Sequence, residues 1–575
     1  MPEMPRPHPF ASRAPWRLTV LLALAVATTG CSAFRRWLVP PPSHVDSTVT
    51  GYGHTHPSNF AELILVVASL PGGDTQETAI AVRDGHIMAR GSLQDVDPLR
   101  GDATRTIRLP GGAATAGLVA GHVRLEMAAM AADSVDLRTC KTTADVVNAI
   151  KLAKPLVLTE SGWLWGDGLD PSVFEKLSSA DLDRAVGRTA VLVTPAGKPV
   201  ALANGGMLAR LGELGADAAN HGGRLDDRQI RLAWQQLPPT RPERLKPLLL
   251  GLFADLQRQG VTEVHAFAAS QSALEALHML DRESRLTVRV RLYLDAERPE
   301  GRALLQPPQP TAAPGAQAPK DDRLLLPQRG KRVPLVQVAG VSLELDGGVL
   351  AGSAALAEPY ADLPFAGTLT YSDAVLQERL TAADRAGVQV AIRASGDAAL
   401  AQVARVLTAM QRAANAPQVR VELPEVVSPE TLDALHTSGV LCVVAPMLTQ
   451  SALDHARHRL GPLRMAWFDR AASLAAATPL QVALDFVHPE AMRAHDRLTR
   501  HNSADPEAMA SVQAWRALSS GGTARLTPPI QVGEDADFVV WSRDPLLPGK
   551  LPPKVIASMV GGTLTLLIGR DANNE

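Results

Sequence analysis

The sequence has little of three features that would narrow its function at once: cysteine, aromatic residues and an excess of one charge. Only 3 cysteines occur in 575 residues, too few for a disulfide framework. Aromatic residues make up 4% of the chain (8 Trp, 4 Tyr and 10 Phe), which argues against stacked platforms for bases or sugars. With 57 basic and 59 acidic residues the net charge is -2, and this balance argues against nucleic acid as a partner.

The remaining composition is that of a large globular protein. A hydrophobic fraction of 46% with 20% charged residues excludes wholesale disorder, and 575 residues can bury one large core and a smaller one. Because aromatic residues are scarce, the core must rest on Ala, Leu and Val.

The N-terminus carries a secretion signal. Two arginines precede an apolar run over residues 18–27, which is too short to span a bilayer and is followed by Thr28-Thr29-Gly30-Cys31. This end resembles the lipobox of bacterial lipoproteins, in which the cysteine becomes the lipidated first residue. We therefore predict a signal peptide over residues 1–30 and a lipid anchor on Cys31, with Ser32 favouring the periplasmic face of the outer membrane. Cleavage without lipidation, leaving a soluble periplasmic protein, is the alternative.

After the signal, residues 31–60 are predicted to be a Pro-rich tether, and the two chain ends to form one small β-sandwich domain. Its first part, residues 61–116, contains short apolar runs, two of which are joined by Asp84-Gly85, a strong hairpin signal. Its second part, residues 520–575, contains further strand-like runs and is interrupted by Gly561-Gly562.

Between these parts, residues 117–519 alternate apolar strand-like runs with helical patterns. Repeated strand and helix imply a parallel sheet, and the number of units favours a closed (β/α)8 barrel of the α/β class, with an open doubly wound sheet as the alternative. Nine candidate runs exceed eight, so one of them, such as residues 189–193, is expected outside the barrel. Residues 298–334 are rich in Pro, Gln and Ala and predict an inserted, poorly ordered surface loop.

Several segments occur in the order found in the metal-dependent amidohydrolases. They are residues 79–87, residues 117–124, Leu345-Asp346-Gly347-Gly348, residues 391–397, Arg420-Val421-Glu422-Leu423 and residues 533–538. On these segments the chain resembles amidohydrolase family 3. The resemblance implies a TIM barrel and a hydrolase of carbon–nitrogen bonds other than peptide bonds, with its metal centre at the carboxyl ends of the barrel strands.

Most positions that the resemblance assigns to metal ligands carry other residues. The family's first strand ends in His-x-His, whose two imidazoles point the same way, but here the pair is His122 and Arg124. A guanidinium has no lone pair to donate, so Arg124 cannot be a ligand. At the other positions the chain has Ser342, Arg393, Leu423 and Asp485, and only Asp485, where the family has its proton-handling aspartate, keeps a ligand type.

The remnants His122 and Asp485 are too few for a hydrolytic zinc, which needs about three protein ligands and an open position for water. We therefore expect no metal cofactor, with Asp485 left as a vestigial proton acceptor. The expected protein is a pseudoenzyme that acts in binding or as an envelope scaffold. The alternative is an active hydrolase with one zinc held by His122, Asp485 and a third ligand that the sequence does not identify, for which His265 and His488 are candidates.

The two arginines suggest how the pocket is used instead. Carboxylates left without a metal would repel one another, so Arg393, and after it Arg124, is expected to pair with Asp485. The alternative is that both arginines turn outward into solvent. A further possibility is a small anionic ligand bound by Arg124, Arg393 and Lys198.

Other candidates carry weaker signals. His54-Thr55-His56 lies in the tether, where no strand orients it, and loop histidines are usually solvated. His265 is expected to be packed and His488 to lie at the surface. Cys140 and Cys442 are expected to be buried, unpaired hydrophobic residues.

Overall fold

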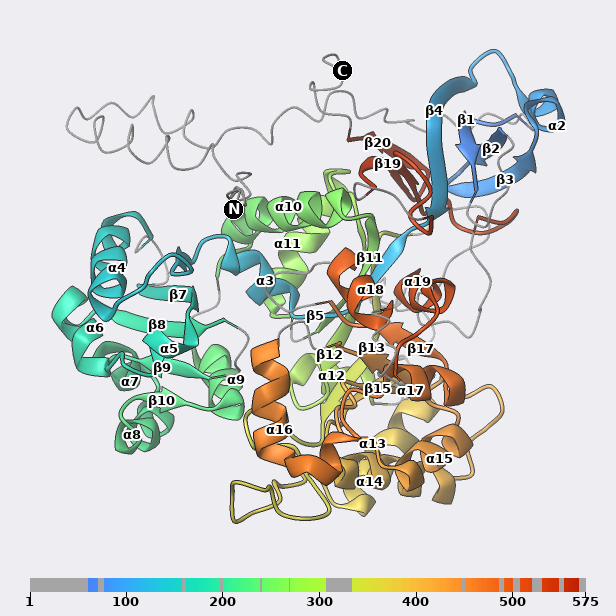
Figure 1. Cartoon of the computed structure of the whole chain (residues 1–575). Coiled ribbons are helices and arrows are strands. Elements are labelled where there is room, and N and C mark those ends of the chain that lie inside the picture. The colour runs from blue at the N-terminus through green and yellow to red at the C-terminus, as the bar shows by residue number, and fades with distance from the viewer. Residues whose placement is uncertain are drawn as a thin grey trace, which may run out of the picture. The chain divides into compact units, whose positions relative to one another are not determined.

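The structure is a computed structural model (Figure 1), and its described residues begin at residue 60. They are 60–70, 77–157, 162–196, 200–237, 240–267, 269–306, 334–446, 450–484, 491–499, 507–519, 530–547 and 553–567. Cys31 and His54-Thr55-His56 therefore lie outside the described residues. Within those ranges, no helix combines the length and the apolar character that crossing a bilayer requires.

The central element is a parallel sheet of eight strands in the order β17-β16-β15-β14-β13-β12-β11-β5. Its strands are β5 (Leu118–Val123), β11 (Val261–Phe267), β12 (Arg289–Asp295), β13 (Val336–Glu344), β14 (Gln389–Arg393), β15 (Arg420–Glu422), β16 (Leu441–Val444) and β17 (Leu480–Val482). The two edge strands meet, since a methyl group on Gly121 of β5 would lie 2.7 Å from the carbonyl oxygen of Val482 in β17. The predicted (β/α)8 barrel is confirmed.

Helices surround this barrel, and most of them bury apolar side chains against it. They are α3 (Leu125–Ala131), α10 (Pro242–Arg258), α11 (Gln271–Arg282), α12 (Pro299–Leu304), α13 (Asp373–Ala386), α14 (Asp397–Ala409), α15 (Pro429–Ser438), α16 (Gln450–Met465), α17 (Ala471–Ala477), α18 (Ala491–Thr499) and α19 (Ser511–Ser519). In α13 the buried residues Leu376, Leu380 and Ala383 recur at helical spacing. The Ser372 side chain caps the start of α13, and Gly387, with a φ of 66°, ends it.

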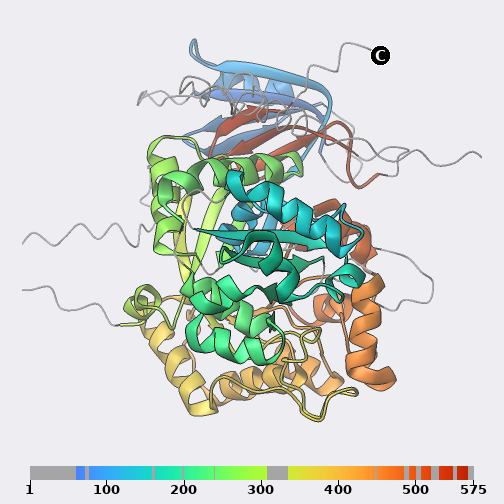
Figure 2. The same cartoon turned by 90° about the vertical axis from the view of Figure 1, so that its left-hand side faces the viewer.

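A second sheet, which the sequence did not reveal as a domain, lies in the segment from 135 to 237, called here the inserted domain. Its strands β6 (Val135–Asp136), β7 (Trp163–Leu169), β8 (Ala190–Pro195), β9 (Ala201–Ala203) and β10 (Arg224–Leu225) follow the order β10-β9-β8-β7-β6. Its helices are α4 (Thr143–Val157), α5 (Pro171–Phe174), α6 (Ser179–Val186), α7 (Gly205–Arg210), α8 (Gly212–Asn220) and α9 (Asp227–Gln236), seen in teal and green in Figure 2. Because β8 belongs to this sheet, the expectation that residues 189–193 lie outside the barrel is confirmed.

Both chain ends build a third sheet, with strand order β20-β19-β18-β4-β1-β2-β3, and its blue and red strands lie side by side in Figure 2. Its strands are β1 (Leu63–Ser69), β2 (Thr78–Arg83), β3 (His86–Gly91), β4 (Arg105–Ala116), β18 (Phe538–Trp541), β19 (Val555–Val560) and β20 (Thr563–Leu566), with the short helices α2 (Leu93–Val96) and η2 (Asp97–Leu99). Asp84 and Gly85 turn between β2 and β3 with positive φ values of 49° and 79°, as the hairpin prediction requires. The predicted β-sandwich domain of both chain ends is confirmed.

The prediction of a loop over residues 298–334 is wrong for the first residues of that segment. Residues 299–304 form α12, because Pro299 stands at the first helical position and Glu300 lies in the first turn. Residues 307–333 lie outside the described residues.

Both described cysteines are buried and make no disulfide, as expected. Burial raises the pKa of the Cys442 thiol to about 12.

Candidate functional site

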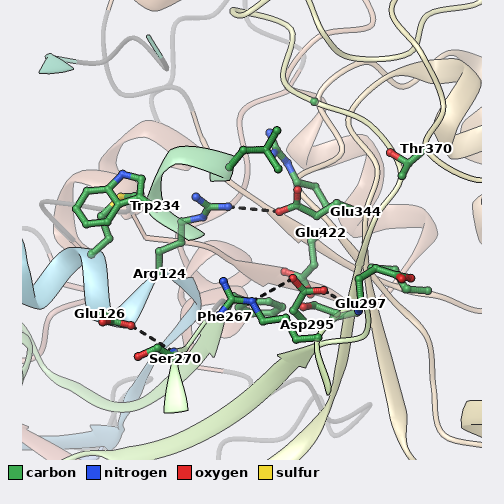
Figure 3. A pocket seen from close by; sticks show the side chains of 18 of the residues that line it. Arg124, Glu126, Trp234, Phe267, Ser270, Asp295, Glu297, Glu344, Thr370 and Glu422 are labelled. Atoms are coloured by element: carbon green, nitrogen blue, oxygen red, sulfur yellow. Dashed lines mark hydrogen bonds and ion pairs between the residues drawn. The ribbon is translucent and has the colours of Figure 1, made fainter. Parts of the chain in front are cut away.

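A cavity of about 730 Å³ opens at the carboxyl ends of the barrel strands (Figure 3). Four of the positions chosen from the sequence line it: His122 and Arg124 at the end of β5, Ser342 in β13 and Arg393 at the end of β14. They converge because parallel strands in a barrel all end on the same face.

The remaining sequence-predicted positions are not seen in this cavity. Leu423 packs instead with Val443 and Ala483, because the backbone turns left-handed at this residue, with a φ of 57° directly after β15. Asp485, His488 and Lys198 lie outside the described residues. Pairing of Arg393 with Asp485 therefore stays a prediction.

His122 lies on the floor of the pocket and is held on two sides. Its Nδ1 lies 2.9 Å from Oε2 of Glu422, and its ring stacks on Phe267 at a centroid distance of 3.9 Å. Burial lowers the pKa of His122; Glu422 opposes this shift, and the charges of Arg124 and Arg393 add to it. Both guanidinium charges therefore act at the pocket floor.

Arg124 faces the pocket and pairs with Glu344, while its predicted pairing with Asp485 stays a prediction because Asp485 lies outside the described residues. Its Nη2 lies 3.4 Å from Oε1 of Glu344, and its side chain is only 19% exposed (Figure 3). The alternative in which this arginine turns outward into solvent is thus excluded. Arg393 is half-buried, lines the same pocket and acts electrostatically on the buried Asp346.

Asp346, which the sequence analysis did not single out, fixes one edge of the pocket. Its carboxylate accepts three backbone N–H bonds, from Ser395 at 2.9 Å, Gly396 at 2.8 Å and Ala355 at 2.9 Å. Burial raises the pKa of Asp346 to about 6, against the lowering effect of these bonds. One carboxylate thus fastens the loop after β13 to the loop after β14.

This raised pKa predicts a pH-dependent stability difference between the wild type and Asp346→Asn. The folded protein binds the proton more tightly than the unfolded chain, so the stabilisation by Asp346 is complete below its ordinary pKa of 3.8 and is lost as pH rises through about 6. The advantage of the wild type over the variant should fall by roughly 2 kcal/mol between about pH 4 and 7, measured by urea unfolding.

Asp373→Asn is the matched control for this measurement. The Arg405 and Gln402 side chains lower the pKa of Asp373 to about 2, so its contribution is lost only in stronger acid. A difference that stays flat for Asp346→Asn between about pH 4 and 7 would contradict the assignment.

Below the pocket, the barrel interior holds a chain of buried charged groups. Oε1 of Glu263 lies 2.8 Å from Nε2 of His265, and Nδ1 of His265 lies 2.6 Å from Nη1 of Arg420. Arg420 donates from Nε to Glu422 at 2.8 Å, which joins the chain to His122. His265 is therefore packed, as expected, and with both ring nitrogens engaged it is not a third metal ligand.

At the amino ends of the strands, this row of buried charged groups continues to the β-sandwich domain. Arg289, 1% exposed, lies 2.7 Å from Asp537 and 3.1 Å from Asp535. Arg291 donates to Glu263 at 2.7 Å. Signals for these groups were present in the sequence as charged residues two apart in otherwise apolar strands, such as Arg289 and Arg291.

The donor groups in the pocket do not fit the metal centre that the fold implies. Within the described ranges, no cluster of three or more His, Cys, Asp or Glu residues is arranged to hold a metal ion. The pocket floor instead presents two guanidinium groups and the Ser342 hydroxyl, and His122 already shares Nδ1 with Glu422. Guanidinium groups repel a cation rather than ligate it.

The chain thus combines an eight-stranded barrel, with a pocket at the carboxyl ends of its strands, and a β-sandwich domain from both chain ends. Two solved structures share this fold: an uncharacterised metal-dependent hydrolase from Pyrococcus horikoshii OT3 and one from Pyrococcus furiosus. The first is 20% identical with a TM-score of 0.67, and the match covers 84% of this chain and 98% of that protein's chain. The second is 21% identical with a TM-score of 0.66, and the match covers 84% of this chain and 100% of that protein's chain.

The sequence model of the amidohydrolase family matches residues 105–563, and the chain belongs to this family. No curated protein matches the chain significantly.

Proposed function

We propose that this chain is a secreted, lipid-anchored amidohydrolase-family protein that has lost the metal centre and binds a small anion in its barrel pocket. The observation that carries the proposal is the convergence of Arg124, Arg393 and Ser342 on one cavity, at positions where the family has metal ligands. The signal sequence and Cys31 support the anchor and a place at the periplasmic face of the outer membrane.

The chemistry of these side chains favours an anion. A guanidinium offers a planar set of N–H donors that matches a carboxylate, and its charge persists at any physiological pH. Arg124 shares its charge with Glu344, whose side chain is 42% exposed, so that pair is open to competition from a ligand. Ser342 adds a hydroxyl that can donate to the same anion.

Thermal-shift titration with acetate at several salt concentrations tests the proposal. Wild-type protein should be stabilised by acetate, more strongly at low salt. The variants Arg124→Gln and Arg393→Gln should each bind it roughly tenfold more weakly, the loss expected for one charge-assisted hydrogen bond. Arg405→Gln, which removes an exposed ion pair with Asp373 outside the pocket, is the control and should bind acetate as the wild type does.

Metal analysis of the purified protein distinguishes the proposed anion-binding function from the alternative, a zinc-dependent hydrolase. Family membership favours an active hydrolase of carbon–nitrogen bonds with one zinc, held by His122, Asp485 and His488 as the third ligand. The binding function predicts well below one equivalent of zinc. Nearly stoichiometric zinc, together with turnover that chelators abolish, would overturn it.

A further inference from the structure

The pocket has an apolar side opposite its charged floor. We define the apolar wall as Met127, Met130, Leu232 and Trp234, all of which line the cavity. The methionines come from α3, and Leu232 and Trp234 come from α9 of the inserted domain. Figure 3 shows Trp234 and Glu344 on opposite sides of Arg124.

The apolar wall is held in place by the packing of the inserted domain. The Asp226 side chain caps the start of α9, and Ala233 is buried in the domain core. The Trp234 ring meets Trp163 and Trp165 edge to face, each at a centroid distance of 5.2 Å. The pocket thus has a fixed aromatic surface beside two adaptable methionine side chains.

Large apolar side chains remain in water at this pocket. Leu232 is 37% exposed, and Leu369, from the loop that precedes α13, lines the same cavity and is 39% exposed. When a ligand covers exposed apolar surface in a concave pocket, the free energy of the complex is lowered. The surface therefore favours a ligand with an apolar part.

The charged residues that line the cavity determine where the charged end of such a ligand binds. Asp295 and Glu297 line the cavity at the end of β12, where burial and the nearby Glu344 carboxylate raise the pKa of Asp295. A carboxylate is disfavoured beside these groups. It is favoured beside Arg124 and Arg393, which both line the cavity.

We propose that the ligand is an amphipathic carboxylate, with its anionic group at Arg124 and Arg393 and an alkyl or aryl tail on the apolar wall. This inference rests on the proposed function, because it takes the anion site as given and adds the chemistry of the rest of the ligand. It assigns the inserted domain a role in selecting the tail.

A series of straight-chain carboxylates (acetate, butyrate, hexanoate and octanoate) tests the inference by isothermal titration calorimetry. Each added methylene should tighten binding about threefold to fourfold while the tail covers the wall. Octylamine, which has the same tail and the opposite charge, should bind at least tenfold more weakly than octanoate, because the arginines repel it.

Two variants of the apolar wall test where the tail of the ligand binds. Leu232→Ser changes an exposed side chain and Trp234→Ala truncates the aromatic surface; both should flatten the chain-length dependence and leave acetate binding within about twofold of the wild type. Leu463→Ser is the control, because Leu463 is 84% exposed and does not line the cavity. It should leave the whole series unchanged.

The outcomes separate the two proposals. Carboxylate binding that is independent of chain length, or a chain-length effect that survives both wall variants, overturns the inference and leaves the proposed function standing. Octylamine binding as tight as that of octanoate overturns it as well. A series in which no carboxylate binds overturns both proposals.

Discussion

Replacing Arg420 with methionine is expected to lower the free energy of unfolding by roughly 3–5 kcal/mol, the cost of removing one partner of a buried ion pair. Arg420 is fully buried and donates to Glu422, to the carbonyl oxygen of Gly121 at 2.9 Å and to the hydroxyl of Tyr293 at 3.2 Å. Methionine fills similar space but leaves the Glu422 carboxylate inside the barrel without its neutralising charge.

Urea unfolding measures this loss, and two further variants define its cause. Arg405→Met breaks an exposed ion pair with Asp373 and should cost less than about 1 kcal/mol. The double variant Arg420→Met with Glu422→Gln should recover part of the stability, because the second change removes the buried charge. An Arg420→Met protein as stable as Arg405→Met would show that the barrel interior does not depend on this pair.

Arg289→Met should have a comparable effect at neutral pH, again roughly 3–5 kcal/mol, because it leaves Asp535 and Asp537 facing each other. Arg289 lies between the barrel and the β-sandwich domain and is 1% exposed. Burial already raises the pKa of Asp535, and the arginine opposes that shift. Without the arginine, the Asp535 carboxylate binds a proton more readily in the folded state.

The pH dependence of this variant provides its test. A folded-state pKa that lies above the unfolded value adds stability at low pH and loses it as pH rises. The deficit of Arg289→Met against the wild type should therefore shrink from about pH 7 to about pH 4 in urea unfolding. Arg108→Met, which breaks an exposed pair with Glu77 in the β-sandwich domain, should show a small deficit at every pH. A large deficit for Arg289→Met that does not change with pH would contradict the electrostatic cause.

The elements of the barrel could be predicted because their signals are local. Apolar runs bounded by turn residues mark strands, and Asp84-Gly85 marks the hairpin between β2 and β3. The inserted domain was missed as a unit. Its strands β6, β9 and β10 have only two or three residues, which is too short for an alternating pattern to be recognised.

The site was predicted in part for a similar reason. His122, Arg124, Ser342 and Arg393 converge because each stands at or near the end of a parallel strand, a position that the strand pattern reveals. Leu423 departs from this rule, because one residue with positive φ redirects the chain after β15. No signal in the sequence pointed to that left-handed turn.

By itself, the sequence determined the order of strands and helices and which residue type stands at each strand end, since both depend on neighbours a few positions away. Only the tertiary structure decided the partners of the charged groups, such as His122 with Glu422, 300 positions apart, and His265 with Arg420, 155 apart. It also decided that the inserted domain brings Trp234 to the barrel pocket. The physical reason is that ion pairs and cavity walls depend on distance in space, and barrel closure brings together segments whose separation along the chain carries no local pattern.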